Sequence, residues 1–251
     1  MGKIIAVVNQ KGGVGKTTTA VNLTAALTEA GKKVLLCDFD PQANATSGLG
    51  VDKRKIHKSV YDAIVSGVPV EEIIVKTRFG DVLPSTADLA GAGVELVTME
   101  SPNYRLRNAL ETVRDQYDLI LIDCPPSLEL LTLNGLCAAD GIMVPVQCEY
   151  YALEGLTDLM TTLWMVKKRL NPRLEIFGVA LTMFDGRTNF STQVAQEVRR
   201  HFPGKVYATV IPRNVRLAEA PSHGLPVTAY DKHSRGALAY KAMAREIIEK
   251  L

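Results

Sequence analysis

Residues 9–19 of this chain read Asn-Gln-Lys-Gly-Gly-Val-Gly-Lys-Thr-Thr-Thr. The stretch follows a short apolar run at residues 4–8 and opens a helical pattern at residues 16–30. Glycines in this setting let backbone N–H groups turn inward around a polyphosphate, and the helix presents its positive amino end to the same group. The stretch therefore predicts a phosphate-binding loop between a strand and a helix.

The side chains of this loop predict what it binds. Lys16 can reach the β- and γ-phosphates of a nucleoside triphosphate, and the Thr17 hydroxyl can ligate Mg²⁺. We expect seven residues of the loop to contribute to ATP binding, namely Gly12, Gly13, Val14, Gly15, Lys16, Thr17 and Thr18. The chain is therefore predicted to be a magnesium-dependent ATPase. Its turnover should be slow, because no residue stands out as an arginine finger acting in cis.

The rest of the chain alternates short apolar runs with amphipathic segments. Further strands are predicted at residues 34–37, 119–122, 141–146 and 176–181, and helices at 16–30, 102–116, 128–138, 153–170, 190–202 and 235–250. Near-continuous hydrophobicity is typical of parallel strands that are covered on both faces. The pattern predicts an α/β fold: a single domain over residues 1–251 with a doubly wound, mostly parallel sheet and helices on both faces. Residues 41–100 are the least regular, with a weak strand near Val82 and a weak helix near Tyr61.

Two of the predicted strands end in aspartates. Asp38 and Asp40 follow the run at residues 34–37, and Asp123 follows the run at residues 119–122. Because the carboxyl ends of parallel strands meet at one edge of a sheet, we expect these carboxylates to face the nucleotide crevice. Asp123 has the form of a Walker B aspartate, which would hold Mg²⁺ through a water, and Pro-Pro-Ser at residues 125–127 would be a switch loop. An aspartate at a strand end can also simply cap a helix.

Bulk properties narrow the class of protein. With 47% hydrophobic and 22% charged residues, the 251-residue chain has enough apolar material for a core. Residues 151–251 hold 15 of the 29 Lys and Arg but only 9 of the 27 Asp and Glu, which hints at an anionic partner, although charges can also fall unevenly on a solvated surface. The chain start lacks a signal-peptide pattern, and four cysteines without CxxC spacing predict buried thiols in a cytoplasmic protein.

The loop resembles the deviant Walker A motif of the ParA/MinD family. Its string Lys-Gly-Gly-Val-Gly-Lys-Thr-Thr has Gln10 where the general P-loop pattern has glycine, and a lysine at Lys11. Residues 145–156 (PVQCEYYALEGL) and 211–224 (IPRNVRLAEAPSHG) resemble the chromosomal ParA branch known as Soj. The resemblance runs over essentially the whole chain.

The resemblance implies roles for individual residues. Lys11 would reach across a nucleotide-sandwich homodimer to the partner's ATP, so that Lys11, Lys16 and Asp40 form the catalytic set. Asp40 would position or activate the attacking water, and Asp38 would lie nearer the Mg²⁺ shell. Pro212, Arg213 and Asn214 would line the adenine, an Asn amide being suited to the edge of that base. Asn214 can equally be a turn-forming residue.

The resemblance also implies partners. The ATP-bound dimer would bind double-stranded DNA without sequence preference, associate with the nucleoid and be stimulated by a ParB-type centromere-binding protein, with a replication initiator as a further partner. The loop begins at about residue 10, which leaves no room for an N-terminal helix-turn-helix domain, so DNA contact would use the ATPase domain itself. Our candidates are Arg187, Arg216 and Arg235, and the weaker choices are Lys232, Arg199, Arg200 and Lys205.

Three other readings compete with this one. A MinD-like membrane ATPase would attach through a C-terminal amphipathic helix, but the polar face of residues 237–251 mixes acidic and basic side chains, which favours packing on the core. An iron–sulfur ATPase would need cysteines facing each other across a dimer axis, whereas Cys124 directly follows Asp123 and precedes two prolines. A scaffold that binds nucleotide without hydrolysis would have no use for Asp40.

Overall fold

The computed structural model describes residues 1–127, 129–149 and 152–251. Leu128, which directly follows the predicted switch loop, and Tyr150 and Tyr151, in one of the Soj-like strings, lie outside the described residues.

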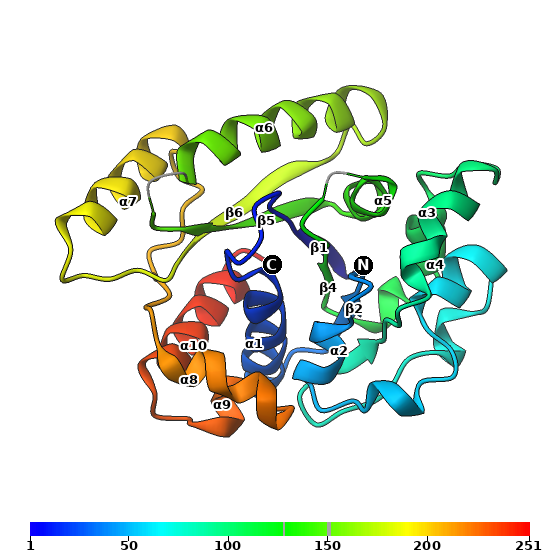
Figure 1. Ribbon diagram of the computed structural model, residues 1–251, viewed down its shortest axis with the longest axis horizontal. Coiled ribbons are helices and arrows are strands. Elements are labelled where there is room, and N and C mark those ends of the chain that lie inside the picture. Colours follow the sequence, from blue (N-terminus) through cyan, green and yellow to red (C-terminus); the bar gives the residue numbers. More distant parts are fainter. Residues whose placement is uncertain (128, 150–151) are drawn as a thin grey trace.

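A six-stranded parallel sheet forms the centre of the molecule (Figure 1), in the order β3-β2-β4-β1-β5-β6. Its strands are β1 (Lys3–Val7), β2 (Val34–Asp38), β3 (Asp81–Leu83), β4 (Leu119–Asp123), β5 (Gly141–Gln147) and β6 (Glu175–Thr182). The five strands predicted from apolar runs are all present, and the weak strand near Val82 is the edge strand β3. The predicted α/β fold is confirmed, and every strand pairing in the described sheet is parallel.

Helices cover both faces of the sheet. Their bounds are α1 (Lys16–Glu29), α2 (Asn44–Gly48), α3 (Leu89–Val97), α4 (Arg105–Glu111), α5 (Leu130–Ala138), α6 (Ala152–Arg169), α7 (Asn189–His201), α8 (Val215–Glu219), α9 (Val227–Tyr230) and α10 (Arg235–Ile248). One core packs α3 to α7 against the sheet, and the other packs α1, α2, α9 and α10 against its opposite face (Figure 1).

The two cores explain why the strands read as continuous apolar runs. In β1, Ile4 and Ala6 belong to the first core, whereas Ile5 and Val7 belong to the second. Since successive side chains of a strand point to opposite faces, a strand covered on both sides needs apolar residues at every position.

The structure departs from the predicted helices mainly between residues 41 and 116. The helix expected at 102–116 is reduced to α4, with a separate 3₁₀ turn at Arg114–Gln116, and the segment near Tyr61 forms a π-helical turn at Asp62–Ser66. Helices α2 and α3 were not predicted. Ala43 has a positive φ of 54° immediately before α2, a conformation that alanine does not signal in a sequence.

The close contact between β6 and Tyr207 generates a stability prediction. A Cβ placed on Gly178 would lie 2.4 Å from the ring of Tyr207, which is fully buried. We expect Gly178→Ala to destabilise the protein by about 2 kcal/mol, because the buried ring cannot move aside without repacking the core. Urea unfolding measures this difference.

Gly93→Ala is the matched control. Gly93 lies inside α3, and its added methyl would meet no atom within 4 Å. Alanine should therefore stabilise this helix by about 0.5–1 kcal/mol. Equal effects of the two substitutions would contradict the packing described at Gly178.

Candidate active site

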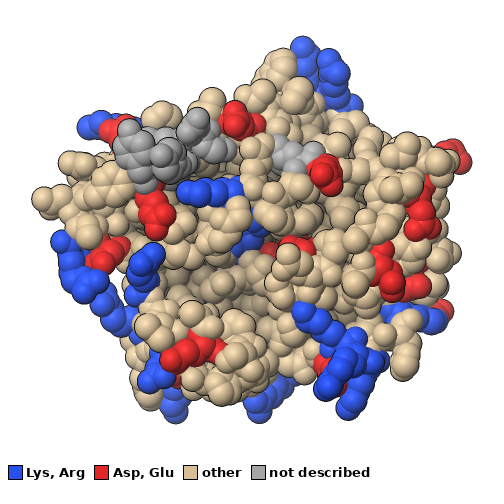
Figure 2. Space-filling model, in the orientation of Figure 1, with Lys and Arg blue, Asp and Glu red and all other residues tan. Residues whose placement is uncertain are grey.

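The carboxyl edge of the sheet brings the phosphate-binding loop and two aspartates together. The loop leaves the end of β1, and Asp38 and Asp123 are the last residues of β2 and β4. In the register of the sheet, Asp123 pairs with both Val7 and Asp38. Figure 2 shows the molecule in the same orientation as Figure 1. A hollow lies near the centre of the view, at the place where Figure 1 draws the amino end of α1.

The backbone of the loop depends on its glycines. Gly13 and Gly15 have positive φ values of 75° and 90°, and Gly15 occupies the N-cap position of α1. Gly12 and Gly13 are exposed, and a Cβ on either would meet nothing within 4 Å. The open space over these glycines gives a bound phosphate access to backbone N–H groups at the positive end of α1.

Lys16 is buried and folded back onto its own loop. Its Nζ donates a hydrogen bond to the Lys11 carbonyl oxygen at 3.2 Å. Burial lowers the pKa of Lys16, while the carboxylates of Asp123 and Asp40 and the Cys124 thiol act in the opposite direction. A polyphosphate entering the loop would offer this ammonium a stronger acceptor than a carbonyl oxygen.

Asp38 is fully buried and held by α2. Its Oδ2 accepts hydrogen bonds from the backbone N–H and the hydroxyl of Thr46, both at 2.7 Å. Burial raises the pKa of Asp38 to about 6, and the Thr46 hydrogen bonds limit the rise. Ser85 N donates to the Thr46 hydroxyl oxygen at 3.0 Å, so the loop after β3 also supports this carboxylate.

Asp123 is fully buried at the end of β4. Neither of its carboxylate oxygens has a hydrogen-bond partner among the described residues. Burial and neighbouring Asp38 raise its pKa well above the usual range, and Thr17 and Lys16 oppose the rise. Two orphaned buried carboxylate oxygens beside the Thr17 hydroxyl fit the shell of a hydrated divalent cation.

The donor set agrees with Mg²⁺ rather than with a metal held by protein alone. Within the described residues, no group of three or more His, Cys, Asp or Glu side chains is arranged to bind a metal. A cation at Thr17 would therefore complete its coordination with phosphate and water oxygens, as Mg²⁺ commonly does in nucleotide sites.

Asp40 lies just beyond the buried pair, half-exposed at the start of the loop that leads to α2. Its backbone N–H donates to Asp38 Oδ1 at 3.3 Å, and its own Oδ1 accepts from Gln42 N at 2.9 Å. Because Asp40 is only partly buried, its carboxylate is accessible to water, as a group that orients water must be.

A cavity of about 200 Å³ adjoins the loop on the side of β6. It is lined by all three predicted adenine residues, Pro212, Arg213 and Asn214, together with loop residues Gly15 and Thr18. The structure thus places both groups of predicted residues around one space. Asn214 also caps α8, because its Oδ1 accepts from Arg216 N at 2.9 Å. Arg213 is exposed and lies 3.5 Å from Glu149.

Several residues of the site were not predicted. Thr182 ends β6, lines the cavity of about 200 Å³ and donates from its hydroxyl to the Val14 carbonyl oxygen at 2.8 Å. Tyr240 of α10 lines the same cavity and shares a 3.1 Å hydrogen bond with Thr19. These residues lie far along the chain, and nothing in the sequence around them indicates contact with the loop.

The DNA candidates lie on neighbouring segments. Phe184 N donates to Ile211 O and Arg213 N donates to Phe184 O, so the loop that carries Arg187 runs beside the start of the segment that carries Arg216. Arg216 in turn lies 3.3 Å from Asp231, close in sequence to Arg235. Lys and Arg side chains gather along the left and lower edges of the face in Figure 2.

Two of these three arginines are engaged in surface ion pairs. Arg187 contacts Asp185 at 2.7 Å, and Arg216 contacts Glu219 at 2.7 Å. Exposed pairs of this kind contribute roughly 0–1 kcal/mol, so a phosphate group can replace the carboxylate at little cost. No ion pair among the described residues involves Arg235. Of the weaker choices, Arg199, Arg200 and Lys205 lie at or beyond the end of α7, and Lys232 lies before α10.

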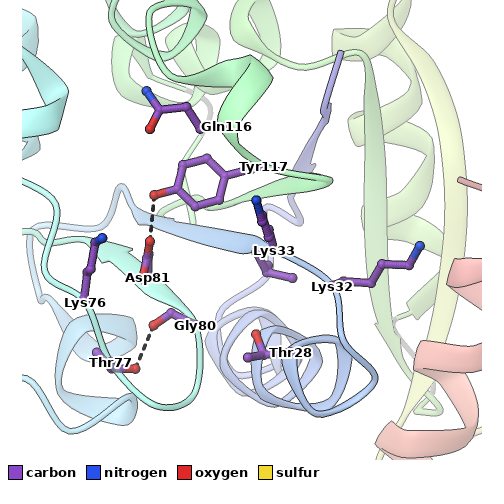
Figure 3. A pocket seen from close by; sticks show the side chains of 10 residues that line it. Thr28, Lys32, Lys33, Lys76, Thr77, Gly80, Asp81, Gln116 and Tyr117 are labelled. Carbon is purple, nitrogen blue, oxygen red and sulfur yellow. Dashed lines mark hydrogen bonds between the residues drawn. The ribbon is translucent and has the colours of Figure 1, made fainter.

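Another cavity, of about 620 Å³, lies at the opposite edge of the sheet (Figure 3). It opens between the starts of β2 and β3, where the Tyr117 hydroxyl donates to Asp81 at 2.8 Å and Lys33 and Lys76 line the walls. It contains no residue of the phosphate-binding loop, so it is separate from the nucleotide site.

Helix α10 and the cysteines, on which two of the rival interpretations depend, are packed in the interior. The apolar residues of α10, including Tyr240, Met243 and Ile247, are buried in the core that α10 shares with α1. No described helix combines the length and apolar character that crossing a membrane requires. All four cysteines are buried. Burial raises the pKa of the Cys124 thiol. The Cys124 sulfur packs closely against α5, since a Cβ on Gly135 would lie 2.8 Å from it.

The orphaned Asp123 carboxylate generates a prediction on pH and stability. Because the folded state raises its pKa, folding favours the protonated form, and the cost of holding the ionised form grows as pH rises above the usual range. Asp123→Asn should therefore stabilise the ligand-free protein by about 1–2 kcal/mol at pH 8, and by less at pH 5. The same variant should lose magnesium-dependent ATP hydrolysis.

Thermal unfolding in EDTA without nucleotide, at both pH values, measures the effect. Asp115→Asn is the control, because the Asp115 side chain is 77% exposed and its replacement should leave the midpoint unchanged. An Asp123→Asn protein that is less stable than wild type at pH 8 would show that the carboxylate has protein partners after all.

Comparisons with known proteins agree with this geometry. A family model described as an AAA domain matches residues 2–176. The chain is 58% identical to the sporulation initiation inhibitor protein Soj of Bacillus subtilis over 249 residues, which cover 98% of each protein. It is 49% identical to the chromosome-partitioning ATPase Soj of Treponema pallidum over 252 residues, covering 100% of this chain and 98% of the relative.

A solved structure with bound nucleotide and magnesium is also similar to this chain. Cobyrinic acid a,c-diamide synthase of Mycobacterium smegmatis, crystallised with ADP and magnesium, matches with a TM-score of 0.86 and 38% identity, covering 99% of this chain and 94% of the other. A glycine-rich loop at the end of β1, the buried carboxylates of Asp38 and Asp123 at the ends of β2 and β4, and these similarities have one common explanation. The chain belongs to the ParA/Soj family of P-loop ATPases, which use ATP and Mg²⁺.

Proposed function

We propose that this chain is a chromosome-partitioning ATPase whose ATP-bound homodimer binds double-stranded DNA without sequence preference. A ParB-type protein stimulates its ATP hydrolysis, and a replication initiator is a further partner. The observation that carries the proposal is the position of Lys11 in an otherwise complete phosphate site. Relatives named for chromosome partitioning support it along the whole length of the chain.

ATP binding begins with the loop. The ammonium of Lys16, which bonds to the Lys11 carbonyl in the ligand-free chain, transfers to the β- and γ-phosphates. Thr17 and Asp123 hold Mg²⁺, with Asp38 as a carboxylate behind it, and the ion supplies charge neutralisation for phosphoryl transfer. Pro212, Arg213 and Asn214 enclose the base at the other end of the site.

Hydrolysis needs a positioned water, and Asp40 is the residue proposed to orient it. Asp40 is half-exposed, so its second carboxylate oxygen can reach solvent, unlike the buried carboxylates of Asp38 and Asp123. A carboxylate at this position contributes by placing the nucleophile in line with the leaving group rather than by covalent chemistry.

Dimerisation follows from the charge of the bound triphosphate. Gly12 and Gly13 are exposed, so the outer side of the loop is accessible to a second subunit. Lys11, one residue before these glycines, then contributes its ammonium to the ATP of the partner. Each subunit lacks this positive charge until the other arrives, which couples the dimer to the triphosphate.

DNA binding is proposed on the surface that carries Arg187, Arg216 and Arg235. These residues contact phosphate groups, so affinity is independent of sequence and falls steeply with salt. Pairing two monomers doubles the number of phosphates contacted by one particle, which makes DNA binding depend on ATP and accounts for association with the nucleoid.

The first prediction of this proposal concerns the nucleotide switch. Wild type and Asp40→Ala should sediment with long random-sequence DNA in ATP but not in ADP, and Lys16→Ala should not sediment in either nucleotide. Asp40→Ala should also lose most of its ATP turnover, because its site still binds ATP but no longer orients the attacking water. Binding to anionic liposomes in place of DNA would overturn the DNA proposal and favour a MinD-like membrane role.

A second prediction tests the DNA surface with a matched pair of arginines. Arg187 and Arg54 are 87% and 89% exposed, and each bonds to an aspartate two residues earlier in the same geometry. Arg187→Ala should lower the slope of log affinity against log salt by about 2 units, because each dimer loses two phosphate contacts. Arg54→Ala should leave the slope unchanged.

Fluorescence anisotropy with labelled duplex DNA at several salt concentrations measures both slopes, in ATP and in an Asp40→Ala background. Equal slopes for the two arginine variants would remove Arg187 from the DNA surface. Loss of DNA binding by Arg54→Ala alone would move the surface to the segment after α2.

A further inference from the structure

Asn9 stands where β1 gives way to the phosphate-binding loop. The backbone ladder between β1 and β5 continues to Val8, whose N–H donates to Met143 O at 3.0 Å. The next link is made by a side chain, because Asn9 Nδ2 donates to Pro145 O at 2.8 Å. Asn9 is 7% exposed, so this bond is shielded from water.

The other end of the same amide holds Lys11. Asn9 Oδ1 accepts a hydrogen bond from the Lys11 backbone N–H at 3.0 Å. With a carbonyl on one side and an N–H on the other, the amide has only one satisfactory orientation. Asn9 therefore fastens the main chain of Lys11 to β5, a strand that is paired on both sides.

The two residues that follow Lys11 are exposed. Gly12 and Gly13 are not packed against neighbouring atoms, since a Cβ on either residue would meet nothing within 4 Å. The later part of the loop has an anchor of its own, the bond from the Thr182 hydroxyl to Val14 O at 2.8 Å. The two anchors thus act on different residues, Asn9 on Lys11 and Thr182 on Val14.

Lys16 supplies a third link that nucleotide is expected to break. Its Nζ bonds to Lys11 O at 3.2 Å in the ligand-free chain. Once Lys16 turns to the phosphates, the Lys11 carbonyl loses that contact, whereas the bond from Lys11 N–H to Asn9 remains. The anchor matters most in the state in which Lys11 is proposed to reach the partner.

We propose that Asn9 is a positioning residue that directs Lys11 toward the second subunit in the ATP-bound dimer. This inference rests on the proposed role of Lys11 in the partner's site. Asn9 itself touches neither reacting atoms nor Mg²⁺. Its contribution is to limit the directions in which the Lys11 side chain can leave the loop, so that less conformational entropy is lost when the dimer forms.

The test compares dimerisation with nucleotide binding in an Asp40→Ala background, which prevents turnover. We expect Asn9→Ala to weaken the ATP-dependent dimer about tenfold by sedimentation equilibrium, equivalent to about 1.4 kcal/mol. Its affinity for ADP as a monomer, measured with a fluorescent ADP analogue, should stay within about threefold of the background. Thr182→Val should show the opposite split, with weaker ADP binding and a dimer that recovers at saturating ATP.

A double-mutant cycle separates positioning from general stability. If Asn9 acts through Lys11, then Asn9→Ala combined with Lys11→Ala should dimerise no worse than Lys11→Ala alone. Additive losses in the cycle, or unchanged dimerisation of Asn9→Ala, would overturn the inference. Where Asn9→Ala fails to fold, Asn9→Ser replaces it, because a serine hydroxyl can still accept from Lys11 N but does not reach Pro145.

The outcome for Lys11→Ala keeps the two proposals apart. If that variant loses the ATP-dependent dimer while Asn9→Ala keeps it, only the positioning role of Asn9 fails. If Lys11→Ala dimerises like the background, the proposed role of Lys11 across the dimer fails, and the role of Asn9 fails with it.

Discussion

The parallel register of β1, β2 and β4 is the constraint on which the rest of this molecule depends. It brings Asp38 and Asp123 side by side at the row where β1 ends and the phosphate-binding loop begins. A shift of one residue in the pairing register of β2 or β4 would turn the aspartate of that strand to the other face of the sheet. The apolar residues that fill both cores therefore also determine where charge meets the loop, so packing and chemistry cannot be changed independently.

This arrangement makes the ligand-free state costly in a specific way. Lys16 is buried against a carbonyl, and Asp123 is buried with no partner among the described residues. Triphosphate and Mg²⁺ are the proposed partners of these two groups, so ligand binding would recover part of the cost of burying them. Asp38 differs because its carboxylate already accepts two hydrogen bonds from Thr46. Its role is therefore to support the site rather than to accept a new ligand.

The sequence predicted the parts of the site that are local. The loop, the strand ends at Asp38 and Asp123 and the major helices follow from periodicity and short strings, because neighbouring residues create them. Helix α2 could not be predicted, since it depends on a positive φ at Ala43 and on the bond between Thr46 and Asp38. The same holds for Thr182, whose role arises only when β6 lies beside the loop.

Nucleotide and DNA are proposed to meet on one short segment. Asn214 lines the cavity of about 200 Å³ beside the loop, and its Oδ1 caps the helix that carries Arg216. Arg187 lies in a loop that is hydrogen-bonded to residues 211–213, immediately before that cap. A change in the segment on binding the base would therefore move or steady both arginines without passing through the rest of the fold. Because one cap orients both Asn214 and α8, a substitution at Asn214 should alter nucleotide affinity and DNA affinity together, whereas a substitution at Arg235, which lies beyond this segment, should affect DNA alone.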